Sequence, residues 1–484
     1  MPRRLLTAAS AAILAVSIIS SCGESAAQPA VTTELSLNEE TVSAETTIYD
    51  SLPQADLGGY EFKVLNNISN FATTTFDVTE QTGDILEDAV YIRNRQIESL
   101  LNCSISVNEE GWDGVQSMVS KSVQAGEDFA DVYFNESHFV IADSLKGYLT
   151  DTKELTDVDI SQPWWNLAAI NSIKVGEPIY CLYGDLHFMY AECYQPVFLN
   201  NGMIKDYGLE RPYSLVNDGK WTIDKMSEYM TAVTSDIDGD GKMKSSDQFG
   251  LGVWAHNTLS FIIGCGMEVV SRNEDNLPYW NGITEEFVAK YTKICDAIFA
   301  ENNRICRDST SGINSLPDTL HSMFHDGRCL FFIEPLGSLK KHRDADFEVG
   351  VLPLPKYDEQ QKDHISYIYH GAAALALPVT CVNTGKVGVI LENLCAYSHE
   401  DVKAAYYDAT LDFKYVNNEE SIDMLDIIFS RGSFDISRVY DWGGYSSKIC
   451  DTLSAGKTDI ASAAAKLDSK ISAAIEKTLE FYQG

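Results

Sequence analysis

The chain has 484 residues, enough for two or three domains, and 45% of them are hydrophobic, enough for sizeable cores. Its 71 acidic and 36 basic residues give a net charge of −35, which argues against nucleic acids and anionic lipid surfaces as partners. Downstream of Cys22, no run of about 18 apolar residues occurs, so no later segment is predicted to span a bilayer.

The start of the chain has the pattern of an export signal. Met1–Arg4 is short and basic, and Leu5–Ile19 is an almost continuous run of apolar and small residues. This run is shorter than the ~20 residues that a transmembrane helix needs, and it is typical of a signal peptide. The ending Ile19-Ser-Ser-Cys22 resembles the lipobox of bacterial lipoproteins, which implies a signal peptide over 1–21 and a lipid on Cys22. A secretory signal followed by a coincidental cysteine is the alternative.

The segment 22–56, which begins with that cysteine, is predicted to be a flexible tether. It is rich in Ser, Thr, Ala and Glu and contains no Lys or Arg. Such a composition cannot bury enough apolar surface to fold. Roughly 30 flexible residues reach about 30 Å, which is enough to hold a folded body away from a membrane.

Beyond the tether, strand and helix patterns alternate. In chain order, the pattern predicts a strand at 61–65, a helix at 86–101, a strand at 103–107, a helix at 115–123, a strand at 130–134 and a helix at 139–148. A second region begins after 180–183, with a helix at 222–233, a strand at 249–254, a helix at 285–299 and strands at 329–333, 347–352 and 372–377. Helices resume near 386, and the last is predicted at 459–481. This alternation indicates βαβ units and a mainly parallel sheet in each region.

Polar and aromatic residues stand at the ends of the predicted strands. Ligands in open α/β sheets bind beyond the carboxyl ends of the strands, so we expect a solute there. Amides, carboxylates and imidazoles can hydrogen-bond sugar hydroxyls, and tryptophan can stack on a sugar ring, although these residues are also common in turns, caps and cores. The candidate ligand-binding residues are Asn66, Asn67, Asn135, Glu136, His138, Trp254, His256, Asn257 and Glu334.

The stretch 236–247 follows the twelve-residue calcium-loop pattern. Carboxylates fall at loop positions 1, 3, 5 and 12, and glycine at position 6 allows the sharp turn. Aspartate replaces the usual glutamate at position 12, and a strand rather than a second helix follows the loop. The pattern predicts structural Ca²⁺, and the alternative is a solvated acidic turn without metal. The candidate ligands are Asp236, Asp238, Asp240, Lys242 through its carbonyl, and Asp247.

The sequence contains none of the common enzyme motifs GxSxG, HExxH, GxxxxGK[ST] and GxGxxG, and His399-Glu400 lacks the second histidine at Lys403. We therefore predict no enzymatic activity and assign no catalytic residues. Because folding rather than sequence spacing brings together the two carboxylates of a glycoside hydrolase, such an enzyme stays open as an alternative.

Three stretches, in this order, carry a resemblance to a known family. They are Trp221–Met226 with Asp236–Gly241 and Gln248–Leu251, then Met323–Phe332, then Gly350–Lys356 with Ala374–Pro378. The chain resembles bacterial extracellular solute-binding lipoproteins, the receptors of ATP-binding-cassette (ABC) importers, in their carbohydrate-type family 1. It departs from maltose-type receptors at Glu334-Pro-Leu336, where these often have Gly-Pro-Trp, so an aromatic side chain is missing at Leu336.

The resemblance implies an α/β, two-lobe, type II periplasmic-binding-protein-like fold, in which helices flank a mainly parallel sheet in each lobe. The first lobe would comprise 57–178 and the return segment 371–425, and the second would comprise 179–370 and the C-terminal helices of 426–484. A hinge of crossing strands would join the lobes, and a cleft between them would hold the solute.

The implied function is capture of a sugar or oligosaccharide and its delivery to ABC permease subunits. The receptor would be a monomer, attached to the extracellular face of the bacterial cell membrane through its lipid alone, with no nucleic acid as a partner. A surface glycoside hydrolase and a non-transport surface adhesin or sensor are the alternatives.

Overall fold

The computed structural model describes residues 48–69, 72–280, 282–299, 305–307, 317–411 and 419–483. Cys22, the predicted signal peptide and most of the predicted tether lie outside these residues. Within the part of the chain that the structure describes, no helix is both long and apolar enough to cross a membrane.

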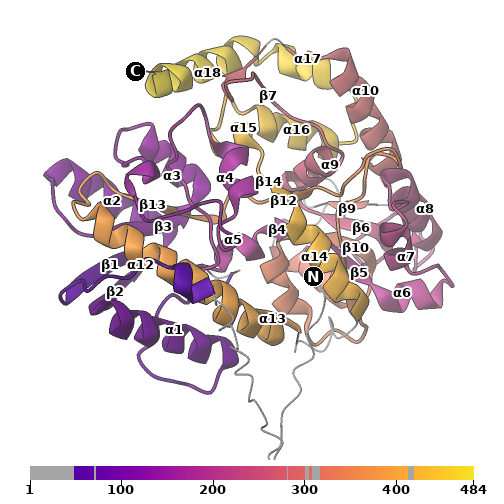
Figure 1. Cartoon of the computed structure of the whole chain (residues 1–484). Coiled ribbons are helices and arrows are strands. Elements are labelled where there is room, and N and C mark those ends of the chain that lie inside the picture. Colours follow the sequence, from indigo (N-terminus) through magenta and orange to yellow (C-terminus); the bar gives the residue numbers. More distant parts are fainter. Residues whose placement is uncertain are drawn as a thin grey trace, which may run out of the picture. The chain divides into compact units, whose positions relative to one another are not determined.

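The first sheet gathers the N-terminal strands and one strand from far along the chain. Its order is β13-β3-β1-β2, formed by Ala373–Ala376, Val132–Glu136, Tyr60–Asn67 and Cys103–Glu110. β1 is parallel to both β2 and β3, whereas β13 runs antiparallel to β3. The helices that pack around this sheet are α1 (Ile85–Leu101), α2 (Trp112–Ala125), α3 (Ser137–Ser144) and α12 (Thr384–Tyr397), as Figure 1 shows.

Helix α1 illustrates how local sequence sets these elements. The Asp84 side chain caps its N-terminus by accepting hydrogen bonds from the backbone N–H groups of Leu86 and Glu87. Asn102 ends the helix in the left-handed conformation, with φ of 49°. The buried side chains of α1 include Val90 and Ile97, at the spacing that places residues on one helical face.

The second sheet has five strands in the order β11-β5-β10-β6-β9. These are Val349–Leu352, Val197–Asn200, Cys329–Ile333, Phe249–Val253 and Ile305–Arg307. β10 and β6 are parallel, whereas β5 runs antiparallel to both β10 and β11, so this sheet is mixed rather than mainly parallel. Every residue of β10 and β6 is buried, as expected for central strands covered on both faces.

Helices pack against this sheet and extend beyond it. Those in contact with its strands are α6 (Asn201–Asp206), α7 (Pro212–Asn217), α8 (Ile223–Val233), α11 (Pro317–His325) and α14 (Glu419–Ser430). The α-helices of the remaining regions are α4 (Leu167–Ile173), α5 (Met189–Glu192), α9 (Leu259–Gly264), α10 (Glu285–Ile294), α13 (Lys403–Leu411), α15 (Ile436–Val439) and α16 (Tyr445–Ser454). A short hairpin pairs β7 (Ser271–Arg272) with β8 (Pro278–Tyr279).

A third, small sheet joins the chain segments that run between the two larger ones. Its order is β14-β12-β4, formed by Gly432–Ser433, Ser366–Ile368 and Tyr194–Gln195. β4 leads directly into β5 of the second sheet, and β12 leads into β13 of the first sheet. The crossing strands expected of a hinge are therefore present, while the residue boundaries predicted for the two lobes stay a prediction.

The C-terminal region differs from the predicted single helix over 459–481. It forms two helices, α17 (Ile460–Ala465) and α18 (Asp468–Gln483). The Leu467 N–H donates to the Ala464 carbonyl at 2.8 Å, a tight turn that ends α17. Ile460 of α17 and Ile471 of α18 are both fully buried, so each helix turns an apolar side chain toward the core.

Seven cysteines of the described residues are free thiols, namely Cys103, Cys181, Cys193, Cys265, Cys381, Cys395 and Cys450. All of these except Cys103 are buried. Burial raises the pKa of Cys265 and Cys395 above the usual thiol value, so these side chains behave as small apolar core residues.

Candidate functional site

The carboxyl end of β3 places Glu136 and His138 side by side. Glu136 is the last residue of β3, and His138 lies in the first turn of α3. The Nδ1 atom of His138 is 3.6 Å from Oε2 of Glu136. Only 19% of the Glu136 side chain is exposed, and this burial raises the pKa of Glu136 to about 7.

Tyr369 and His370 lie beside this pair. They belong to the segment that links β12 to β13. The His370 ring centroid is 5.2 Å from that of His138 and 4.3 Å from that of Tyr369. Gly371 permits the close packing, since a Cβ atom added there would lie 2.7 Å from the Tyr369 ring and 3.6 Å from the Glu136 carboxyl carbon. The first sheet thus presents a compact polar and aromatic cluster at this edge.

The second sheet contributes Trp254, His256 and Glu334 to the same place. Trp254 follows β6 directly, His256 lies in the 3₁₀ turn Ala255–Thr258, and Glu334 follows β10 directly. The His256 ring is 6.1 Å from the Trp254 ring and 6.1 Å from the Tyr369 ring. Rings from one sheet therefore meet rings from the other.

We call this set the junction site. It consists of Glu136, His138, Trp254, His256, Glu334, Tyr369 and His370. Five of these seven residues were predicted from the sequence, and the structure brings those five together.

Burial sets the charge state of the junction site. Only 11% of the Glu334 side chain is exposed, and burial raises its pKa to about 7, although the nearby Lys341 opposes this. Burial, followed by the charge of Arg438 in α15, lowers the pKa of His370 to about 2. Burial also lowers the pKa of His138. Near neutral pH the imidazoles of His138 and His370 are uncharged, and the carboxyls of Glu136 and Glu334 are each protonated in part of the molecules. Such groups suit hydrogen bonds with an uncharged polar solute.

The four predicted asparagines have a different setting. All are buried, and the amide nitrogen of each donates a hydrogen bond within the protein. Asn66 donates to the Thr74 carbonyl at 2.8 Å, and Asn135 donates to the Trp112 carbonyl at 3.2 Å. Asn67 donates to Asn135, and Asn257 donates to the Ile333 carbonyl, at 3.4 and 3.0 Å respectively. In this structure the asparagines hold the strand ends in place.

One detail of the sequence prediction was wrong. Asn66, Asn67, Asn135 and Glu136 were expected just after their strands, but they are the last residues of β1 and β3. The strands extend beyond their apolar residues. In β1 this occurs because its pairing with β2 continues as far as Asn67.

The sequence reasoning missed Tyr369, His370 and Arg438. The predicted residues all follow the carboxyl ends of strands, which meet at one edge when all strands are parallel. β13 is antiparallel to β3, with Ala373 opposite Glu136, so residues just before β13 reach the same edge. The aromatic pair Tyr369-His370 ahead of the apolar run was the available signal.

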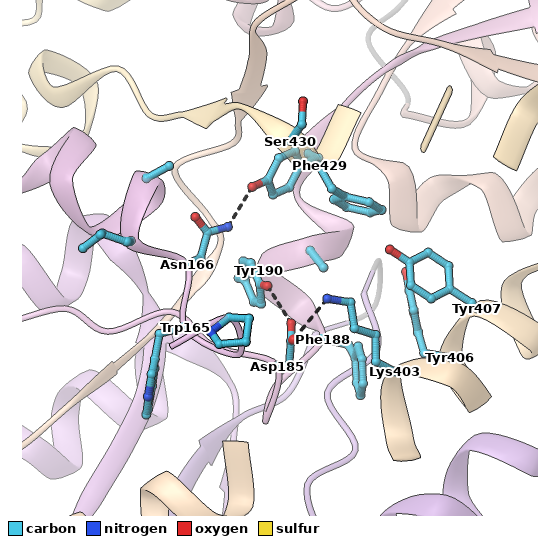
Figure 2. Close-up of a pocket in the computed structure, with 15 residues that line it drawn as sticks. Trp165, Asn166, Asp185, Phe188, Tyr190, Lys403, Tyr406, Tyr407, Phe429 and Ser430 are labelled. Atoms are coloured by element: carbon cyan, nitrogen blue, oxygen red, sulfur yellow. Dashed lines mark hydrogen bonds and ion pairs between the residues drawn. The ribbon is translucent and has the colours of Figure 1, made fainter. Parts of the chain in front are cut away.

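A separate cavity of about 210 Å³ has an aromatic lining that the sequence reasoning did not identify as a site. Figure 2 shows the Tyr190 hydroxyl and the Lys403 amine pointing at Asp185. These groups lie 3.0 and 3.1 Å from its carboxylate oxygens, and Asn166 donates to the Tyr194 hydroxyl at 2.8 Å. Several polar groups that line this cavity thus bond to one another, whereas the junction site combines side chains from both sheets and is the stronger candidate. The aromatic lining residues are Trp165, Phe188, Tyr190, Tyr194, Tyr406, Tyr407 and Phe429.

The predicted calcium loop brings three carboxylates together. Oxygen atoms of Asp236, Asp238 and Asp240 all lie within 4.8 Å of one another. Ser235 and Gln248 exchange two backbone hydrogen bonds of 3.1 Å, which close the base of the loop. A set of carboxylate oxygens suits a hard cation such as Ca²⁺.

Two further groups shape this loop. The Lys244 amine lies 3.3 Å from Oδ2 of Asp238 and contacts Asp240, so a positive charge already sits at the carboxylates. Asp247 is fully buried, and its two oxygens accept hydrogen bonds from the backbone of Ile237 and Lys244 at 3.0 and 2.7 Å. The donor set of Asp236, Asp238 and Asp240 fits a cation. Backbone N–H groups of the loop bond both oxygens of Asp236, as they do both oxygens of Asp247.

No protein-family model and no curated protein matches this chain. Solved structures do match it. A cyclo/maltodextrin-binding protein complexed with maltotetraose is 15% identical, with a TM-score of 0.55 over 89% of this chain and 98% of that protein. An ABC transporter solute-binding protein from Thermotoga lettingae, bound with α-D-tagatose, is 14% identical, with a TM-score of 0.52 over 87% of this chain and 100% of that protein.

A third match is UgpB from Mycobacterium tuberculosis in complex with glycerophosphocholine. It is 13% identical, with a TM-score of 0.53 over 87% of this chain and 99% of that protein. The chain has a type II periplasmic-binding-protein-like fold. This confirms the fold class predicted from the sequence, and the small sheet β14-β12-β4 occupies the connections between the two larger sheets of that fold.

Proposed function

We propose that this protein is a solute receptor that binds a sugar or oligosaccharide at the junction site and delivers it to an ABC permease. The observation that carries the proposal is the meeting of Glu136 and His138 from one sheet with Trp254 and Glu334 from the other, around Tyr369. The shared fold of proteins that hold maltotetraose and tagatose supports it.

Binding would be coupled to closure of the two lobes. A solute held by Glu136 from the first sheet and by Trp254 from the second gains all of its contacts only when both sides are close to it. The closed state is then favoured because it binds the solute more tightly than the open state does. Crossing strands such as β12 and β4 would bend during closure, and a permease would recognise the closed form.

The chemistry of the junction site favours a neutral, hydroxyl-rich solute. Carboxyls with a pKa of about 7 can both donate and accept hydrogen bonds near neutral pH, as sugar hydroxyls do. Trp254 is buried in this structure, and its ring would stack on the C–H face of a sugar that enters the junction site. A solute that lacks a matching hydroxyl would leave a buried polar group unpaired, at a cost of about 1–3 kcal/mol.

A thermal-shift screen of mono- and oligosaccharides tests this proposal. A sugar that binds should raise the melting temperature and be recovered unchanged. Conversion of the sugar would instead indicate the alternative of a glycoside hydrolase, and the absence of stabilisation by any sugar would remove the proposed solute class. Glu136→Ala and Trp254→Ala should each weaken binding about tenfold or more, whereas the exposed Glu127→Ala should leave it unchanged.

Attachment to the cell surface is the second part of the proposal. The lipobox-like Ile19-Ser-Ser-Cys22 supports a lipid on Cys22, which would place the receptor on the extracellular face of the membrane. Cys22→Ser should abolish labelling by a fatty-acid analogue and release the protein from the membrane fraction. Unchanged labelling in that variant would contradict lipidation.

We also propose that the acidic loop binds structural Ca²⁺ through Asp236, Asp238 and Asp240, with the Lys242 carbonyl as a further ligand. Extracellular calcium modules need an affinity of only about 10⁻⁴–10⁻³ M. Added Ca²⁺ should therefore raise the melting temperature of the purified protein, and Asp240→Ala should remove most of that rise. A melting temperature that neither Ca²⁺ nor a chelator changes would refute the proposal.

A further inference from the structure

Trp112 stands apart from the other tryptophans. All seven lie in the described part of the chain, and Trp112 is the one whose side chain is exposed, at 48%. It begins α2, and Gly111 alone separates it from the end of β2 in the first sheet. An exposed ring of this size lacks the stabilisation that burial would give, and such a ring is often a contact surface for a ligand.

The Trp112 ring is held in a fixed orientation. It stacks on Phe139 of α3 with a centroid distance of 5.0 Å and an angle of only 4° between the ring planes. The Asn135 amide donates to the Trp112 carbonyl at 3.2 Å, which fixes the backbone at the same point. One face of the indole is thus covered by Phe139, and the ring is ordered before any ligand arrives, which lowers the entropy lost on binding.

Rings run without a gap from Trp112 to the junction site. Phe139 is 4.0 Å from His138, and His138 is 5.2 Å from His370. Beyond His370, each step is between 4.3 and 6.1 Å. The series in spatial order is Trp112, Phe139, His138, His370, Tyr369, His256 and Trp254.

Carboxylates lie beside Trp112, the end of this ring series that is farther from the junction site. Asp113 is exposed, and its Oδ1 accepts a hydrogen bond from the Gly114 N–H at 2.9 Å. A Cβ atom added at Gly114 would lie 2.8 Å from the Glu110 carboxylate, so glycine there leaves room for that group. An exposed indole face beside carboxylates is a combination that suits a sugar ring, with C–H groups over the indole and hydroxyls on the acids.

We propose that Trp112 forms an outer saccharide-binding subsite, and that the solute is an oligosaccharide running from the junction site to this indole. The inference rests on the proposed function and narrows its solute class. Three rings stand between Trp112 and Tyr369 in this series, so we expect a single sugar unit at Tyr369 not to reach the indole. Trp112 would then set a preference for longer chains.

Calorimetric titration of the full-length protein tests the subsite. The probes are the mono-, di-, tri- and tetrasaccharides of the α-1,4-glucan, β-1,4-glucan and β-1,4-mannan series, compared on the wild type, Trp112→Ala and Trp112→Phe. In the series that binds, Trp112→Ala should weaken the longest saccharide about tenfold and leave the shortest binder unchanged, because one stacked ring is lost. Trp112→Phe should recover part of the lost affinity. Tyr279→Ala removes another exposed ring and should change the affinity for neither the longest nor the shortest saccharide.

The outcomes separate the two proposals. If no saccharide binds the wild type, the proposed sugar function fails and the subsite fails with it. If saccharides bind and Trp112→Ala keeps the wild-type affinity at every chain length, or loses affinity equally at every length, the subsite alone is refuted. Unchanged binding together with lost uptake in cells would assign the indole to a protein partner and would also overturn the subsite.

Discussion

Glu136 makes the stability of this protein depend on pH in a direction that a substitution can isolate. Burial raises the pKa of Glu136 from 4.5 to about 7. The folded protein therefore holds the proton more tightly than the unfolded chain does. As the pH rises from about 4.5 to about 7, the folded state must bury an increasing negative charge, and the free energy of unfolding falls over that window. Glutamine has a similar shape and carries no charge at any pH, so Glu136→Gln should abolish this part of the fall.

The size of the effect follows from the shift in pKa. A shift of about 2.5 units at 1.36 kcal/mol per unit sets a ceiling of about 3 kcal/mol. Because 19% of the side chain is exposed to water, we expect about 1–2 kcal/mol. At an unfolding entropy of about 2.1 cal/mol/K per residue, that corresponds to a change of about 1–2 °C in melting temperature for a body of this size.

Calorimetry at pH 5.0 and pH 8.0 gives the comparison. Between these two values, the melting temperature of Glu136→Gln should rise relative to that of the wild type by about 1–2 °C. Other titrating groups are shared by both proteins and cancel in this difference. Glu127→Gln, which changes an exposed glutamate, should show no such relative rise. Parallel pH profiles for the wild type and Glu136→Gln, or a relative fall at pH 8.0, would refute the reasoning.

Three further outcomes are expected. Lys244→Ala should tighten Ca²⁺ binding measured by titration, because the Lys244 amine lies at the carboxylates of Asp238 and Asp240; unchanged or weaker binding would argue against a cation there. Gly250→Ala should lower stability to chemical denaturation by about 1–3 kcal/mol or more, because its Cβ atom would lie 2.5 Å from the Cα atom of Met230. Glu334→Gln should show the same relative stabilisation at alkaline pH as Glu136→Gln, since burial raises both pKa values to about 7, and a pH profile parallel to that of the wild type would contradict this.

The central strands were predictable because their sequence patterns are local. Cys329–Ile333 is a short apolar run between Arg328 and Glu334, and the structure places β10 on these five residues. Both faces of the strand are covered, so the run is continuous instead of alternating. Glu334 follows such a strand directly, which is why the sequence could place it at a sheet edge.

The remaining part of the site depends on contacts between distant residues. Nothing in the segment around Asn66 indicates that its amide would bond the Thr74 carbonyl and the ring of His187. Tyr369 reaches the junction site because β13 joins the first sheet in the antiparallel sense, and the direction of a strand leaves no mark on its own apolar pattern. The sequence indicates which residues lie at strand ends, but it does not indicate which of their side chains point into the junction site.

The position of β13 has a consequence for how the protein can be made. β3 pairs with β1 on one side and with β13 on the other, so the first sheet is complete only when Ala373–Ala376 is present. A ribosome must therefore synthesise the entire second sheet before the first one can close. A fragment that stops near residue 180 would leave the edge of β3 unpaired, and such an edge is a template for aggregation. The first sheet of this molecule therefore cannot be produced as one uninterrupted piece of chain.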